Sequence, residues 1–269
     1  MTKEQIKEYL KPIAVGFFGK QGTKRYVRPQ FTVRPLEMMM EDLKEIDEVD
    51  WYKYSFSTEP LNGKFNDEQR RDFAVKSIAC GQEYAKRLIQ QYGTNDPVKL
   101  ARALKMTINY PDYPEKADRV LFAEFREPNI INIYMDAVKR SAAQMENAKL
   151  RSIMTDKLTV SNLLLAHLLF LYVVESAKAE IFTLNEKIEL WHIGPITNRS
   201  VVIAFSEIAA MAFAKEITEL PYSPYLMDVF LVYGYSPQEA SGLYETMMTY
   251  AQRTPRIPET DTVKEIENQ

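Results

Sequence analysis

The sequence predicts a mostly helical α+β protein with one small sheet. Apolar residues recur at helical spacing in five successive segments from residue 136 onward, whereas strand-like runs are confined to residues 105–135. The chain has 269 residues, of which 46% are hydrophobic and 26% are charged. This composition supplies a sizeable buried core and excludes a disordered chain.

The N-terminal part of the chain, residues 1–65, is expected to be irregular, and it could pack on the body of the protein. Its first 35 residues hold eight basic side chains against two acidic ones, and residues 36–50 reverse this balance. The simplest interpretation is that the basic arm folds against the acidic stretch of its own chain. Because aromatic residues are interleaved with the basic ones, nucleic-acid binding by the arm is an alternative. The net charge of −3 argues against nucleic acid as the main partner.

Capping residues predict the first two helices of the body. Asn66 and Gln69 have the spacing of a capping box, and Gly93 stops the apolar pattern that follows them. We therefore expect a helix over about residues 66–92. Asp96 precedes a proline, which predicts the cap and first position of a second, shorter helix.

Three short runs after these helices have the composition of strands. The second and third are expected to form a hairpin through the turn around Glu127 and Pro128. The remaining chain is expected to be helical as far as residue 252. The expected strands are 105–110, 120–125 and 129–135, and the expected helices are 136–152, 159–184, 200–218, 223–233 and 237–252.

The longest apolar run, Leu163 to Val174, is too short to cross a membrane. It has 12 residues, and a spanning helix needs roughly 20. A buried core helix is therefore expected, and no membrane partner. One cysteine and an N-terminal stretch without an apolar signal-peptide core favour a cytoplasmic location. The sequence leaves the oligomeric state open.

Four segments resemble the ImmA/IrrE-type metallopeptidase domain, which has a zincin-like fold. Tyr84–Pro97 is similar to the entry of that domain, and Ile130–Asp136 is similar to one of its strands. Leu165–His167 matches the beginning of its LAHExxH motif, and Glu207–Ala214 is similar to its ExxAxxFA helix. The resemblance implies a zincin-like domain over residues 66–253, followed by a polar tail at 254–269.

The resemblance also implies that the peptidase chemistry is lost. The family needs two histidines one helical turn apart to hold zinc, a glutamate after the first histidine as general base, and a downstream acidic ligand. Here His167 keeps the first position, but Leu168 replaces the base and Leu171 replaces the second histidine. Glu207 matches the downstream ligand. We therefore expect no catalytic residues and no cofactor, only a relict site at His167, Leu168, Leu171 and Glu207.

Two alternatives for these residues stay open. His167 is most simply a neutral buried histidine, with Glu207 as a candidate hydrogen-bond partner. The other alternative is a zinc-dependent hydrolase with non-standard ligands, in which His167 and Glu207 hold the metal. Its third ligand would come from Glu175, Glu180 or His192.

The partner that the resemblance implies is a protein or peptide. Active members of the family cleave repressor-type proteins in the cytoplasm, so a degenerate member could hold such a partner without cutting it. The expected binding place lies beside the strand at residues 130–135, because an unpaired strand edge accepts an extended peptide. The expected function is therefore a regulatory or protein-binding scaffold.

Overall fold

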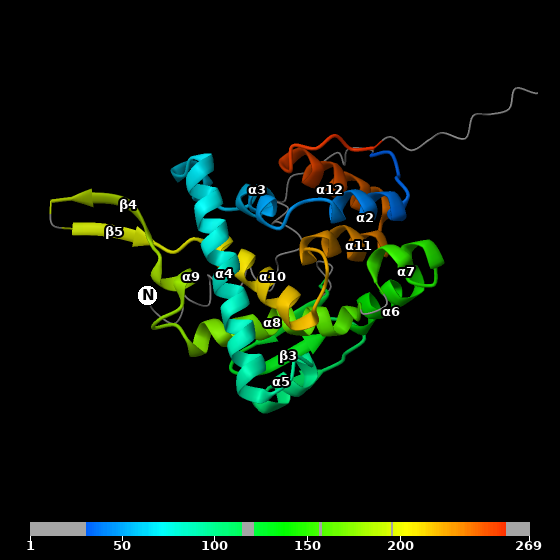
Figure 1. Ribbon diagram of the computed structural model, residues 1–269, viewed down its shortest axis with the longest axis horizontal. Coiled ribbons are helices and arrows are strands. Elements are labelled where there is room, and N and C mark those ends of the chain that lie inside the picture. Colours follow the sequence, from blue (N-terminus) through cyan, green and yellow to red (C-terminus); the bar gives the residue numbers. More distant parts are fainter. Residues whose placement is uncertain (1–30, 115–120, 156–157, 195, 257–269) are drawn as a thin grey trace, which may run out of the picture.

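The computed structural model describes residues 31–114, 121–155, 158–194 and 196–256. Most of the basic arm and the end of the polar tail lie outside the described residues. Within them the chain forms eleven α-helices, a three-stranded mixed sheet and a separate two-stranded hairpin (Figure 1). The prediction of a mostly helical α+β fold is confirmed.

Residues 36–64 contain four helical segments joined by short turns, so the expectation of an irregular segment is wrong for this part. Leu36, Met39, Met40 and Leu43 recur at helical spacing and are all buried. The many acidic residues between them obscured this apolar stripe in the sequence. The helices are α2 (Leu36–Lys44) and α3 (Tyr52–Ser57), with short 3-10 helices η2 (Val49–Trp51) and η3 (Asn62–Lys64) beside α3.

The two helices predicted from capping residues are confirmed. In α4 (Asp67–Tyr92), the Gln69 amide donates to Asn66 Oδ1 at 2.8 Å, and the Asn66 amide donates to Gln69 Oε1 at 3.0 Å. Gly93 ends the helix in a left-handed conformation with φ of 64°. In α5 (Pro97–Ala103), Asp96 accepts hydrogen bonds from the first-turn amides. Both helices are therefore defined by local hydrogen bonds.

We expect Gly93→Ala to lower the free energy of unfolding by about 1 kcal/mol, because a Cβ disfavours the left-handed backbone. Nothing lies within 4 Å of the position that this Cβ would take, so the effect reports backbone conformation alone. Gly93→Asn should cost less, since asparagine tolerates this conformation. Urea unfolding of the two variants checks the order, and equal losses would contradict it.

The three-stranded sheet has the order β1-β3-β2. The predicted hairpin is present, with β2 and β3 antiparallel and Phe125 opposite Ile131. On its other side β3 pairs in parallel with β1, and Ile108 lies opposite Ile131. The strands are β1 (Thr107–Asn109), β2 (Ala123–Arg126) and β3 (Ile130–Ile133). The third strand is therefore central, with a neighbour on each side.

Two of the five expected C-terminal helices are each broken into two. The first stops at Gln144, and Asn147 caps the start of the next piece, because its side chain accepts from the amides of Lys149 at 2.9 Å and Leu150 at 3.1 Å. The second ends at Ala177 and resumes five residues later. The pieces are α6 (Met135–Gln144) and α7 (Ala148–Met154), then α8 (Val160–Ser176) and α9 (Phe182–Asn185).

The last three expected helices are present with small changes of boundary. One of them begins with a single 3-10 turn before it becomes α-helical. The elements are α10 (Ile203–Thr218), η4 (Pro224–Leu226), α11 (Met227–Tyr233) and α12 (Pro237–Tyr250). A hairpin of β4 (Ile188–Ile193) and β5 (Ile196–Ser200) was not predicted. Figure 1 shows it projecting away from the helices.

The core is organised around α10, which packs between α4 and α8. At the crossing with α4, Gly81 lies against the backbone of α10, and a Cβ there would stand only 2.9 Å from the amide nitrogen of Phe213. A second group of buried side chains joins α3, α4 and the start of α10 through aromatic contacts, centred on Phe205. Within the described residues, none of the helices combines the length and hydropathy that a membrane crossing requires.

Candidate functional site

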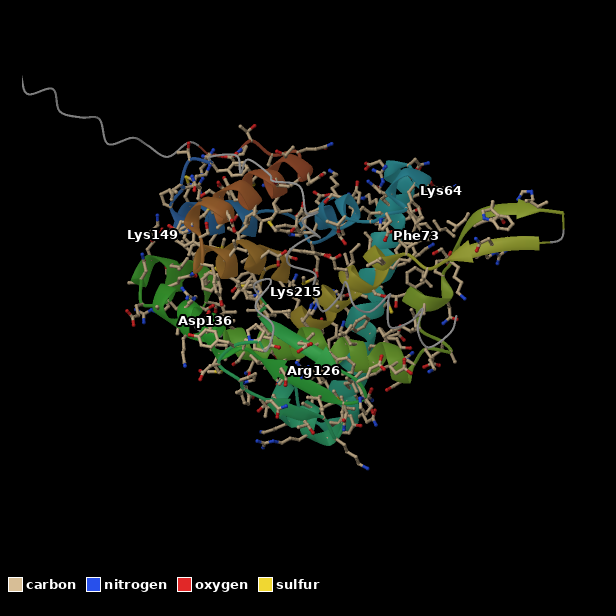
Figure 2. All side chains as sticks on the ribbon, turned by 180° about the vertical axis from the view of Figure 1, so that it is seen from behind. Lys64, Phe73, Arg126, Asp136, Lys149 and Lys215 are labelled. Carbon is tan, nitrogen blue, oxygen red and sulfur yellow. The ribbon has the colours of Figure 1, made fainter. Side chains whose placement is uncertain are left out.

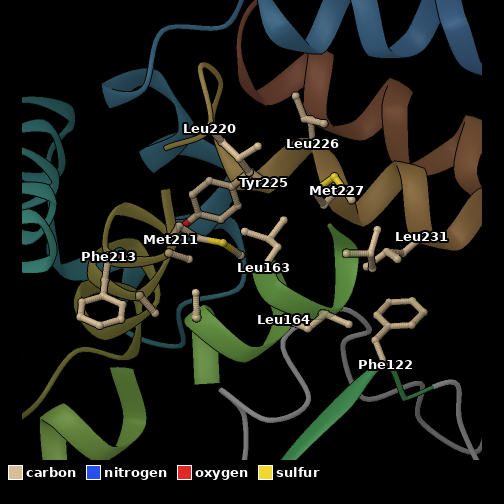
Figure 3. Close-up of a cluster of buried hydrophobic side chains, with 14 of the residues drawn as sticks. Phe122, Leu163, Leu164, Met211, Phe213, Leu220, Tyr225, Leu226, Met227 and Leu231 are labelled. Atoms are coloured by element: carbon tan, nitrogen blue, oxygen red, sulfur yellow. The ribbon is translucent and has the colours of Figure 1, made fainter. Parts of the chain in front are cut away.

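The motif helix α8 is buried on nearly all of its faces, and His167 lies near its middle. The imidazole lines a small cavity of about 20 Å³ together with apolar side chains from α8, α10, η4 and α11. Figure 3 shows Leu163 and Leu164 of α8 facing Met211, Met227 and Leu231 there. A space of this size holds one water molecule at most.

Burial lowers the pKa of His167 to about 4. The side chain is only 8% exposed, and a charged imidazole is costly among apolar neighbours. The histidine is therefore neutral at pH 7, as the simplest sequence interpretation expected.

The two leucines that follow His167 in the motif are both core residues. Leu168 is 3% exposed and Leu171 is 1% exposed. They belong to the same apolar cluster as the neighbouring leucines of α8. The positions that would carry a general base and a second imidazole in a peptidase are therefore part of the packed interior, and aliphatic groups neither bind a metal nor accept a proton.

Glu207 lies on α10 in a different environment from His167. The residue as a whole is partly exposed, but its carboxyl group is buried. Burial raises its pKa to about 8, with a smaller contribution from the negative charge of Glu59, while the Ser55 hydroxyl acts in the opposite direction. The side chain is therefore protonated at pH 7, a state in which it is a poor metal ligand.

A buried polar cluster surrounds Glu207, formed by Ser55, Tyr54, Tyr225 and Asp228. The Tyr54 hydroxyl donates to Asp228 Oδ2 at 3.2 Å, and burial together with the charge of Glu207 raises the pKa of Asp228 well above its ordinary value. The rings of Tyr54 and Tyr225 meet edge-on with centroids 5.9 Å apart. Among the described residues, Ser55 Oγ, the Tyr225 hydroxyl and Asp228 Oδ1 have no partner in ideal hydrogen-bond geometry.

Sequence reasoning missed this cluster. Its members lie on α3, η4, α10 and α11, which are separated by up to about 170 residues and meet only in the folded chain. Each residue alone looks like an ordinary surface or core position. The high proportion of tyrosine in residues 222–235 was the one indication that the sequence offered.

His167 and Glu207 lie in different surroundings. The imidazole lines the apolar cavity, and burial is the cause of the lowered pKa of His167. Burial raises the pKa of Glu207, and the neighbours that also shift this pKa are Ser55 and Glu59. The surroundings of His167 are therefore apolar and those of Glu207 are polar, and a hydrogen bond between the two residues stays a prediction.

The proposed third ligands lie elsewhere. His192 is on the projecting hairpin, where its Nδ1 is 2.6 Å from Glu189 Oε1. Glu175 accepts a hydrogen bond from Lys178 at 2.6 Å, and Glu180 accepts one from Tyr84. The portion of the chain that the structure describes has no group of three His, Cys, Asp or Glu side chains suited to hold a metal ion.

The acidic stretch at residues 36–50 already has basic partners from the body. Lys149 and Arg256 pair with Glu41, Lys215 pairs with Glu48, and Arg71 pairs with Asp50. Of the basic arm, only Arg34 lies within the described residues, and its guanidinium binds Glu245 on α12 at 2.8 Å. The rest of the arm, and with it the nucleic-acid alternative, lies outside them.

The arrangement as a whole consists of a neutral histidine beside a small apolar cavity and, separately, a protonated Glu207 near Asp228, whose pKa burial also raises. Neither part presents a free base at pH 7, because the imidazole pKa of about 4 leaves a weak proton acceptor and the Glu207 pKa of about 8 leaves an acid. Comparisons of the chain with family models, with curated proteins and with solved structures found no match.

Proposed function

We propose that this chain is a catalytically inactive relative of the ImmA/IrrE-type metallopeptidases, with a zincin-like fold, that acts as a protein-binding or regulatory scaffold. One observation carries the proposal: Leu168 and Leu171 are buried in the core at the two motif positions where a peptidase needs a base and a metal ligand. The neutral state of His167 agrees with it. Cleavage of a bound protein is therefore not expected.

The leucines at positions 168 and 171 also stabilise the fold. Burial of each leucine side chain contributes roughly 1.5–3 kcal/mol. In an open catalytic cleft these positions would have to face solvent and substrate instead. A chain that no longer cuts gains stability by packing this helix on all sides, which fits a scaffold that presents its outer surface to a partner.

The place where an extended partner could bind differs from the sequence-based expectation. A peptide was expected beside residues 130–135, but β3 has β1 on one side and β2 on the other, so that expectation is wrong. Backbone pairing requires a strand with one unpaired edge. Within the described sheet, β1 and β2 are the outer strands, and we place the proposed peptide partner on one of these two edges.

The first test is the metal content and peptidase activity of the protein purified without added zinc. We expect less than stoichiometric metal and no chelator-sensitive hydrolysis of peptides or of repressor-type proteins, because the general base and the second histidine are absent. His167→Ala provides the matched variant. Stoichiometric metal in the wild type that is lost in His167→Ala would overturn the proposal and favour the metal-dependent hydrolase.

A second test restores the motif. In the double variant Leu168→Glu with Leu171→His, two imidazoles stand one turn apart on α8, as zinc binding requires. We expect the melting temperature of this variant to be lower than that of the wild type without zinc and to rise when zinc is added. Leu168→Gln with Leu171→Gln has comparable polarity without the ligands. An equal response of both variants to zinc would remove the support for the family resemblance.

A further inference from the structure

The hairpin of β4 and β5 stands apart from the rest of the protein. Figures 1 and 2 show both strands extending into solvent beyond α4 and α9. Among the described residues, contacts hold its base: Ile188 packs beside the aromatic cluster around Phe205, and Lys64 Nζ donates to the carbonyl of Leu190 at 3.2 Å. An isolated two-stranded hairpin is marginally stable in water, so its outer half needs additional contacts.

The outer half of the hairpin exposes two large apolar side chains and has no acidic residue, lysine or arginine. Trp191 is 47% exposed and Ile193 is 72% exposed, although both are large hydrophobic side chains. No Lys, Arg, Asp or Glu occurs in residues 190–198, whereas such residues make up 26% of the whole chain. A partner that binds through charge, such as a nucleic acid or an anionic membrane, has no counterpart here.

The hairpin also offers backbone groups for pairing. Its sheet contains β4 and β5 alone within the described residues, so each strand has one neighbour and one open edge. An open edge with exposed apolar side chains is a template for addition of another strand. The residue pairs of β4 shift at Leu190, which places Trp191 and Ile193 two residues apart in the regular outer part of the strand.

We propose that β4 pairs antiparallel with β4 of a second copy of this chain, so that the two hairpins form one four-stranded sheet across a two-fold axis. A two-fold axis at His192 places Trp191 of each copy opposite Ile193 of the other. Aromatic and β-branched residues are favourable cross-strand neighbours. Such an interface is closed and self-complementary, which is the commonest symmetry of protein dimers.

The lack of acidic side chains at the end of the hairpin suits a second copy of the chain. Two molecules of net charge −3 repel each other as whole bodies, but residues 190–198 contain no Asp or Glu and approach each other without that cost. Glu189 and Arg199, which lie opposite each other at the base of the hairpin, mark the end of this stretch. This inference does not depend on the proposed scaffold function.

Sedimentation analysis of the full chain over a range of micromolar concentrations tests the proposal. We expect twice the chain mass of 31.2 kDa at high concentration and dissociation on dilution. Trp191→Asp with Ile193→Asp should give the single-chain mass throughout, with an unchanged circular dichroism spectrum because both residues lie outside the core. Tyr113→Asp is the matched control, since Tyr113 is 68% exposed on another part of the surface.

Tryptophan fluorescence gives an independent measurement. The chain has two tryptophans, and Trp51 is buried at 2% exposure, so a concentration-dependent blue shift of the emission reports Trp191. We expect the shift in the wild type and in Tyr113→Asp. A wild type that stays at the single-chain mass at every concentration overturns the proposal. So does a dimer that survives the double substitution.

Discussion

Gly81→Ala is expected to lower the free energy of unfolding by about 3 kcal/mol or more. The added methyl group would overlap the carbonyl oxygen of Ala209 and lie 2.9 Å from the amide nitrogen of Phe213. Both atoms belong to the backbone of α10, so rotation of a side chain cannot remove the overlap. Relief therefore requires α4 and α10 to separate along the most extensive helix contact in the protein.

Chemical denaturation and circular dichroism check this result. The matched control is Gly63→Ala, where nothing lies within 4 Å of the new Cβ, and its unfolding free energy should change by less than about 0.5 kcal/mol. A loss below about 1 kcal/mol for Gly81→Ala would show that the two helices tolerate a wider spacing than the close packing of protein interiors allows.

The contribution of Glu207 to the stability of the protein should fall as the pH rises from about 4.5 to about 8. The pKa of Glu207 is about 8 in the folded chain and 4.5 ordinarily, because the carboxyl is removed from water. Between these values the unfolded chain has released the proton that the folded chain keeps, so each rise in pH favours unfolding. Asp228, whose pKa is also raised, acts in the same direction.

Glu207→Gln isolates this contribution. The amide keeps the shape of the protonated carboxyl and cannot ionise, so we expect the variant to match the wild type near pH 4 and to exceed it by roughly 3–5 kcal/mol near pH 8.5. Urea unfolding across this range is the measurement. Parallel stability curves for the two proteins would show that Glu207 ionises freely in the folded state.

A loss of stability on the acid side is expected from His167. Its pKa is about 4 when folded and 6.5 ordinarily, so the unfolded chain takes up a proton first as the pH falls through this range. Folding stability contributed by the neutral imidazole is therefore lost between pH 6.5 and 4. Urea unfolding between pH 7 and pH 4 measures this loss.

The sequence predicted those parts of the fold whose causes are local. The capping box at Asn66 and Gln69 and the left-handed Gly93 lie within a few residues of the backbone groups that they satisfy. The antiparallel pairing of β2 and β3 follows from a short turn. By contrast, the parallel pairing of β1 with β3 depends on two segments more than twenty residues apart, and no local pattern specifies it.

The elements that the sequence did not predict were missed for physical reasons as well. The projecting hairpin escaped notice because the register shift beside Leu190 interrupts the alternation of apolar and polar residues that identifies a strand. The helix α2 escaped notice because its acidic face dominated the composition of residues 36–50. For the candidate site, the sequence located His167, Leu168 and Leu171 on one core helix, whereas the surroundings of Glu207 depend on long-range packing.

Glu59 links residues 31–65 to the helix α10, so the chain should not be divided at residue 66 without loss of structure. Both carboxylate oxygens of this buried residue are used: one accepts from the Leu61 amide at 2.9 Å and the other from the Ala204 amide at 3.0 Å, in the first turn of α10. A fragment that starts at residue 66 would leave that turn without its acceptor and would expose the Phe205 ring. Such a truncated polypeptide should aggregate on expression, and supplying residues 31–65 as a separate peptide should recover its solubility.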